Sequence, residues 1–202
     1  MNSYLNKQIE YIFGKTFDEM TDEEKSEITE ITIFLKDFNG DFTGASISDL
    51  LKFPSLKKCL INGFSITDND LRLLDSIETL RGIQFSKCNF SESTIPLGDI
   101  ELVVLDSCEN VSKQLLQKNK SLRYLRVVNQ DYFDAMSLNE CTNLVEAYLQ
   151  RTTVSNLTAL TRLKELKLVN LNGSRFNFIA YTHLKSSVKV EYAKDSAPGL
   201  DR

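Results

Sequence analysis

The sequence contains no long apolar run and no excess of basic side chains. No stretch approaches the roughly 18 apolar residues of a transmembrane helix, and the residues after Met1 lack the apolar core of a secretory signal peptide. The 202 residues include 28 acidic and 24 basic side chains, so no basic excess favours a phosphate backbone. We therefore expect a cytoplasmic protein with no membrane and no nucleic-acid partner.

Residue types that carry catalysis or hold cofactors are also scarce. The four cysteines lie far apart and form no C-x-x-C pair, so neither a zinc site nor a thioredoxin-like motif is indicated. His183 is the single histidine, and no nucleophile motif accompanies it. The eight glycines never form a G-x-G-x-x-G loop, and no acidic stretch has the spacing of a calcium loop. The sequence thus predicts no enzyme, no cofactor and no metal site.

What the chain does contain is a recurring apolar spacing, clearest at residues 80–90. Leu80, Ile83 and Phe85 are followed by Cys88, at the point where the backbone must turn, and then by Phe90. This spacing resembles the leucine-rich repeat L-x-x-L-x-L-x-x-N/C-x-L, in which a short strand precedes a sharp bend. Further units recur about every 22 residues, inside the range of roughly 20 to 29 residues that is typical of the repeat.

The aligned units are defined by the three apolar positions of their L-x-x-L-x-L segment. They are Ile28/Ile31/Ile33, Leu56/Cys59/Ile61, Leu80/Ile83/Phe85, Ile100/Val103/Leu105, Leu122/Leu125/Val127, Leu144/Ala147/Leu149, Leu163/Leu166/Leu168 and a weaker Lys185/Val188/Val190. One strand and its return segment cannot bury their apolar side alone, whereas stacked copies build a continuous core.

The resemblance implies an α/β fold: a leucine-rich repeat solenoid, or horseshoe, with parallel strands on its concave face and helices and turns outside. Residues 28–193 would form an array of about eight units, and residues 194–202 a flexible tail. N-cap residues ahead of helical spacing predict return helices near 47–51, 67–74 and 111–116. The shorter return at 154–160 suits a 3₁₀ turn.

Residues 1–27 are expected to form an N-terminal helical cap. Leu5, Ile9 and Ile12 recur at helical spacing on one apolar stripe, and residues 21–24 have the form of a capping box that starts a second helix. A repeat array needs such a cap because its first strand would otherwise expose an apolar edge.

In the repeat family, the bend after the strand holds Asn or Cys, whose inward side chain helps to satisfy backbone groups. The equivalent positions here are Phe64, Cys88, Cys108, Gln130, Thr152 and Leu171. Only the two cysteines match strictly, which indicates an irregular array. Residues 154–166 resemble the short bacterial type of the repeat. Cys88 and Cys108 lie on consecutive coils, so a disulfide is conceivable, but a cytosolic setting predicts two reduced, buried thiols.

Side chains between the apolar strand positions would point outward and line the concave face. An exposed sheet face should be mainly polar, so a cluster of apolar and aromatic side chains with nearby arginines indicates a protein interface. The alternatives are that another segment covers this face, or that β-propensity alone places such residues there. The predicted partner-binding residues are Leu60, Leu102, Val104, Tyr124, Arg126, Val128, Tyr148 and Arg151.

These features favour a noncatalytic protein–protein interaction module that binds another protein on its concave face. One alternative is an immunity or inhibitor protein that neutralises a toxin or enzyme. A second is the substrate-recognition subunit of a larger enzyme complex such as a ubiquitin ligase, as leucine-rich repeat proteins sometimes are. A homo-oligomer joined through exposed strands is a further possibility.

Overall fold

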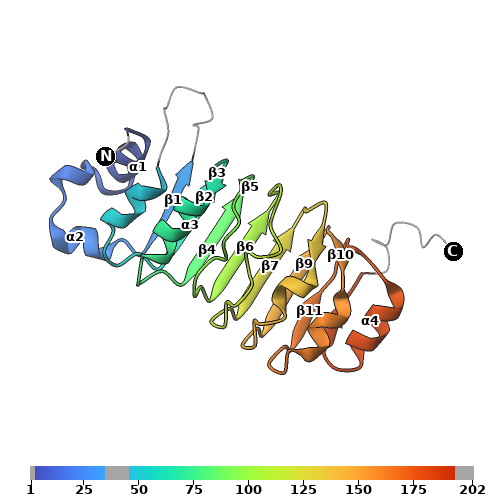
Figure 1. The fold of residues 1–202 in the computed structure, drawn as a ribbon. Helices are drawn as coiled ribbons and strands as arrows, with labels where there is room; N and C mark the ends of the chain where they lie inside the picture. Colours follow the sequence, from blue (N-terminus) through green and yellow to red (C-terminus); the bar gives the residue numbers. More distant parts are fainter. Residues whose placement is uncertain (1–2, 35–45, 194–202) are drawn as a thin grey trace.

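A computed structural model describes residues 3–34 and 46–193 of the chain. Over these residues the protein is a leucine-rich repeat solenoid in which eight parallel strands stack side by side (Figure 1). Neighbouring strands are joined in register, for example Ile83 opposite Val103 and Val103 opposite Leu125. In sheet order the strands are β1 (Glu30–Phe34), β2 (Lys58–Asn62), β4 (Gly82–Ser86), β6 (Leu102–Asp106), β7 (Tyr124–Val128), β9 (Glu146–Gln150), β11 (Leu168–Asn170) and β13 (Lys189–Glu191).

The return segments form the other layer of the solenoid. They contain two smaller parallel sheets, two α-helices and three 3₁₀-helices. The strands are β3 (Ser65–Thr67) with β5 (Asn89–Glu92), and β8 (Phe133–Asp134), β10 (Thr153–Ser155) and β12 (Arg175–Phe176). The helices are α3 (Asp68–Asp75), α4 (Phe178–Lys185), η2 (Ile47–Lys52), η3 (Ala135–Leu138) and η4 (Leu157–Arg162).

Of the four predicted return elements, two are confirmed, and residues 47–51 lie in η2, which is a 3₁₀-helix and not an α-helix. The α3 helix begins after Thr67, whose hydroxyl accepts the amide of Asp70, and η4 is the expected 3₁₀-helix. Residues 111–116 form turns instead of a helix. There the Ser112 hydroxyl accepts the amide of Gln114 at 3.1 Å, a local bond that competes with the hydrogen bonds of a helix.

The N-terminal cap consists of α1 (Ser3–Phe13), η1 (Phe17–Glu19) and α2 (Asp22–Glu27). Leu5 and Ile9 are buried in the common core, and the predicted capping box of α2 is present. Ile12 was predicted to lie on the same buried stripe, but its side chain is 68% exposed. The expected tail at 194–202 lies outside the described residues.

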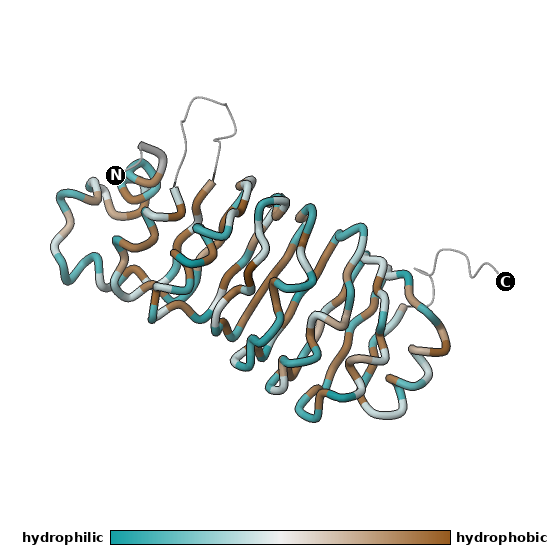
Figure 2. Tube along the Cα trace, viewed as in Figure 1, coloured by the Kyte–Doolittle hydropathy of each residue, from teal (hydrophilic) through white to brown (hydrophobic). Residues whose placement is uncertain are grey.

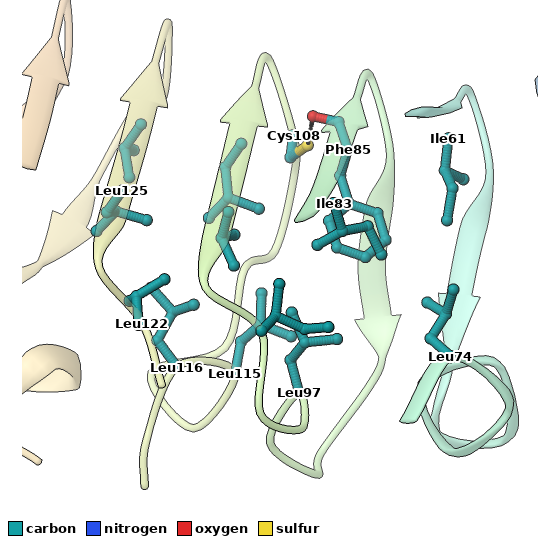
Figure 3. Close-up of a cluster of buried hydrophobic side chains, with 14 of the residues drawn as sticks. Ile61, Leu74, Ile83, Phe85, Leu97, Cys108, Leu115, Leu116, Leu122 and Leu125 are labelled. Carbon is teal, nitrogen blue, oxygen red and sulfur yellow. Dashed lines mark hydrogen bonds between the residues drawn. The ribbon is translucent and has the colours of Figure 1, made fainter. Parts of the chain in front are cut away.

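The core lies between the large sheet and the return segments. Figure 2 shows apolar segments along the strands and polar ones at the bends. In Figure 3, Leu97 and Leu115 of the return segments pack beneath Ile83 and Phe85 of β4. Burying one such side chain contributes about 1.5 to 3 kcal/mol.

The bends after β2, β4, β6, β7, β9 and β11 each turn through one residue in the left-handed region. These residues are Gly63, Lys87, Ser107, Asn129, Arg151 and Gly173, with φ between 50° and 79°. The following side chain points inward, and the predicted role is confirmed at the two cysteines: Sγ of Cys88 donates to the carbonyl of Ile61 and Sγ of Cys108 to that of Phe85, each at 3.4 Å (Figure 3).

The seventh and eighth units are shifted from their predicted register. Val169 pairs with Ala147, so the three repeat positions of the seventh unit are Leu166, Val169 and Leu171, whereas the sequence assigned Leu163, Leu166 and Leu168. Leucines recur at several spacings in this segment, and only the pairing with β9 selects among them. The bend position moves with the strand: Ser174, and not Leu171, donates to the carbonyl of Leu149 at 2.6 Å.

The last strand is also shifted, by two positions where the seventh unit is shifted by three. Val190 pairs with Val169, so it occupies the central inward position of β13 that was assigned to Val188. Lys189 and Glu191 flank Val190 and therefore point to the outward face of the large sheet.

Candidate functional site

Strands β6, β7 and β9 bring most of the predicted binding residues together. Tyr124 stands opposite Leu102 on one side, and Arg126 stands between Val104 and Tyr148. Directly opposed residues of neighbouring strands lie on the same face and within contact distance. These five outward side chains therefore form one continuous surface, which we call the β6–β9 surface.

The exposure of these side chains follows their position on the sheet. Leu102, Val104 and Tyr148 are half-buried, Tyr124 is 40% exposed and Arg126 is exposed. Solitary exposed apolar residues are ordinary, but a contiguous set on a sheet face is a usual mark of an interface.

Val128 was wrongly expected to be an exposed contact residue. Only 7% of its surface is exposed. It stands directly between Asp106 and Gln150 of the flanking strands, where cross-strand neighbours lie within contact distance. Val128 therefore forms part of the floor of the surface.

Leu60 is half-buried on β2 and does not adjoin the other predicted residues. Gln84 of β4 separates it from Val104 of β6. The structure therefore brings Leu60 onto the same face as the β6–β9 surface but not into contact with it.

Arg151 lies beside the β6–β9 surface, in the bend after β9, where its φ is 50°. It lines a shallow cavity of about 470 Å³ together with Arg126, Gln150 and Asn172. None of the ion pairs between described residues involves Arg126 or Arg151. Two guanidinium groups and two side-chain amides at one cavity can receive a carboxylate through charge-assisted hydrogen bonds.

Glu146 borders the same surface and modifies one of its tyrosines. The hydroxyl of Tyr148 donates to Oε2 of Glu146 at 2.8 Å. This hydrogen bond, with burial and the charges of Glu146 and Glu191, raises the pKa of Tyr148. The hydrogen bond to Glu146 also restrains the orientation of the Tyr148 ring.

Two lining residues, Gln150 and Asn172, were not predicted as functional. Gln150 occupies an outward position of β9, and the register predicted for β11 did not place Asn172 at the outward bend. If Val169 had been aligned with Ala147 from the sequence, Asn172 would have been predicted at the outward bend, in the position equivalent to Gln150.

The described residues contain no group of three or more histidine, cysteine or acidic side chains that could hold a metal ion. His183 is exposed on α4. The four cysteines are free and buried, and burial raises the pKa of the Cys59 and Cys141 thiols to about 12. Nor does any described helix have the length and apolar character needed to cross a membrane.

The fold, together with the inward hydrogen bonds from the bend residues Cys88, Cys108 and Ser174, defines the class of protein as a leucine-rich repeat solenoid. No protein-family model matches the sequence, and no curated protein sequence matches it. Solved structures with a similar fold include internalin C2 of Listeria monocytogenes, with a TM-score of 0.58 and 16% identity over 95% of this chain and 93% of that one. A second internalin of that organism, inlF, has a TM-score of 0.56 and 17% identity over 95% of this chain and 63% of its own length. These similarities establish the fold.

Proposed function

We propose that this protein is a noncatalytic binding module whose partner is another protein, held on the β6–β9 surface. The observation that carries the proposal is the contiguity of Leu102, Val104, Tyr124 and Tyr148 around Arg126 on one exposed sheet face. Tyrosine and arginine dominate the energetically important positions of interfaces, because they combine apolar area with directional hydrogen bonding.

The rigidity of the solenoid supports the same proposal. The strands that carry the surface are paired on both sides, so their backbone has little freedom to lose on binding. The hydrogen bond between Tyr148 and Glu146 also fixes one aromatic side chain in advance. A preorganised surface binds with a lower entropic cost than a flexible one.

The cavity beside the surface favours a partner with an exposed carboxylate. Arg126 and Arg151 have no ion pair among the described residues, so a carboxylate of the partner could pair with both. Such contacts are screened by salt, so we expect binding to weaken as ionic strength rises.

The test is quantitative capture of partners from the source cell by the wild-type chain and by a Tyr124→Ala/Arg126→Ala variant. The variant should lose its specific partner, with affinity falling by about 30-fold or more, as for interface hot spots. Tyr11→Ala is the matched control, because Tyr11 is 92% exposed on the N-terminal cap. Equal capture by the wild type and the surface variant would contradict the proposal.

The two narrower functions use the same surface and differ in what the partner does. An inhibitor of a toxin or enzyme would abolish the activity of the captured protein, whereas a recognition subunit would leave its partner enzyme active. An activity assay on the captured partner, with and without this chain, therefore separates them. A cytoplasmic location is part of the proposal and is supported by the four free cysteines.

A further inference from the structure

The two ends of the large sheet differ in what packs against their terminal strands in the described part of the chain. At the β1 end, the cap buries Leu5 and Ile9 in the core. At the other end, β13 is the last strand and pairs only with β11 among the described strands (Figure 1). A strand edge with unpaired backbone groups is a template for another strand.

The helix behind this edge is also incompletely covered. In α4, Leu184 is fully buried, but Phe178 and Ile179 of the first turn are 54% and 70% exposed. Terminal units of repeat proteins normally present a polar outer face. Among the described residues, an unpaired edge of β13 and the exposed Phe178 and Ile179 lie at the same end of the array, which favours an interaction surface there.

The sequence of β13 identifies what fits this edge. Lys189 and Glu191 point to the same face, on either side of the inward Val190. If two copies of β13 pair antiparallel with the two Val190 residues opposite each other, each Lys189 stands across from Glu191 of the other copy. The strand is therefore complementary in charge to itself.

We propose that a second copy of this chain adds to β13, with a two-fold axis that passes between the two Val190 residues and is perpendicular to the sheet. The two large sheets then form one continuous sheet, and their outward faces point to the same side. Behind them, the two α4 helices become neighbours and cover Phe178 and Ile179. Such an isologous contact closes at two chains and does not propagate into a filament.

The ion pair within one strand is compatible with this arrangement. Nζ of Lys189 lies 2.7 Å from Oε1 of Glu191, and Oε2 of Glu191 accepts the side-chain amide of Asn170 at 3.0 Å. In the dimer, two such pairs meet and form a four-charge cluster of alternating sign. Networks of this kind hold register better than isolated surface pairs.

The first test is the mass of the wild-type chain by size-exclusion chromatography with light scattering over a range of concentrations. We expect a mass twice the 23.0 kDa of one chain, falling towards one chain on dilution. A mass of one chain at every concentration overturns the proposal. If residues 194–202 of the same chain occupied the edge of β13, the measurement would give this monomer mass.

Charge reversal tests the register. Lys189→Glu places two carboxylates on β13, and Glu191→Lys places two ammonium groups there, so each variant alone should be monomeric. An equimolar mixture should form a heterodimer, because opposite charges then face each other although the pair within each chain stays broken. A mixture that remains monomeric, or single variants that dimerise like the wild type, would overturn the arrangement.

A matched pair of variants tests whether α4 contributes to the dimer contact. Ile179→Lys should yield a monomer, whereas Ile12→Lys, at a 68% exposed position on the opposite cap, should leave the dimer intact. Circular dichroism confirms that both variants fold. Dimerisation of the Ile179→Lys variant at wild-type concentrations would exclude α4 from the contact.

Discussion

The ammonium nitrogen of Lys113 lies 2.7 Å from Oδ2 of Asp134, a carboxylate whose side chain is 3% exposed. The other oxygen, Oδ1, accepts the backbone amide of Met136 at 3.0 Å and the side-chain amide of Asn156 at 2.8 Å. One carboxylate thus connects three consecutive return segments on the side of the solenoid away from the β6–β9 surface.

Asp134 should make the stability of the fold depend on pH. Burial raises the pKa of Asp134, but the hydrogen bonds from Lys113 and Asn156 outweigh it and lower the pKa below its usual value. A carboxyl group whose pKa is lower in the folded than in the unfolded chain stabilises the fold at pH values above its unfolded pKa of about 4. This contribution is lost as the pH falls through the native pKa.

We therefore expect Asp134→Asn to lower the free energy of unfolding by about 1 to 3 kcal/mol at pH 7. The difference from the wild type should shrink below about pH 4. Urea denaturation between pH 7 and pH 3 measures this, with the exposed Asp131→Asn as control. A difference that stays constant over this range would show that the charge of Asp134 has no role.

Ser174 should be needed for the last bend of the array. Its hydroxyl donates to the carbonyl of Leu149 at 2.6 Å and accepts the amide of Thr152 at 3.1 Å, and the residue is 2% exposed. Ser174→Ala leaves two buried backbone groups without partners and should cost about 1 to 3 kcal/mol. The exposed Ser91→Ala is the control in urea denaturation, and equal stability of the two variants would disprove the role.

Gly173 should resist substitution for two separable reasons. Its φ is 74°, and an added Cβ would lie 3.0 Å from Cγ of Arg151. Gly14 has a similar φ of 69° but nothing within 4 Å of an added Cβ. Gly14→Ala should cost about 1 to 2 kcal/mol for the backbone alone, and Gly173→Ala should cost more.

The excess cost at Gly173 should disappear when Arg151 loses its Cγ. Arg151→Ala in the Gly173→Ala background should therefore recover stability until only the backbone cost remains. A double-mutant cycle by thermal denaturation measures this coupling. Additive effects of the two substitutions would contradict the contact.

The register of β11 predicts opposite responses at two adjacent residues. Val169 is fully buried and Leu168 is half-buried on the outward face. Val169→Ala should lower the free energy of unfolding by about 2 kcal/mol, and Leu168→Ala by less than about 1 kcal/mol. If chemical denaturation ranks them in the reverse order, the register first predicted from the sequence would be the correct one.

The sequence by itself determined the repeat architecture, the cap of α2 and the bends at Cys88 and Cys108. These features depend on spacing along the chain: a strand alternates its faces every two residues, and a capping box needs Thr21 and Glu24 three residues apart. All five residues of the β6–β9 surface could be listed in advance for the same reason, since the first six strands of the large sheet keep the predicted register.

Only the tertiary structure decided the register of β11 and the burial of Val128. Leu163, Leu166, Leu168 and Leu171 satisfy more than one spacing, and the pairing of Val169 with Ala147 selects one of them. Val128 is outward by alternation, yet it is buried between its neighbours on two other strands. Spacing specifies which way a side chain points, whereas its exposure depends on residues that are distant in the chain and adjacent in the fold.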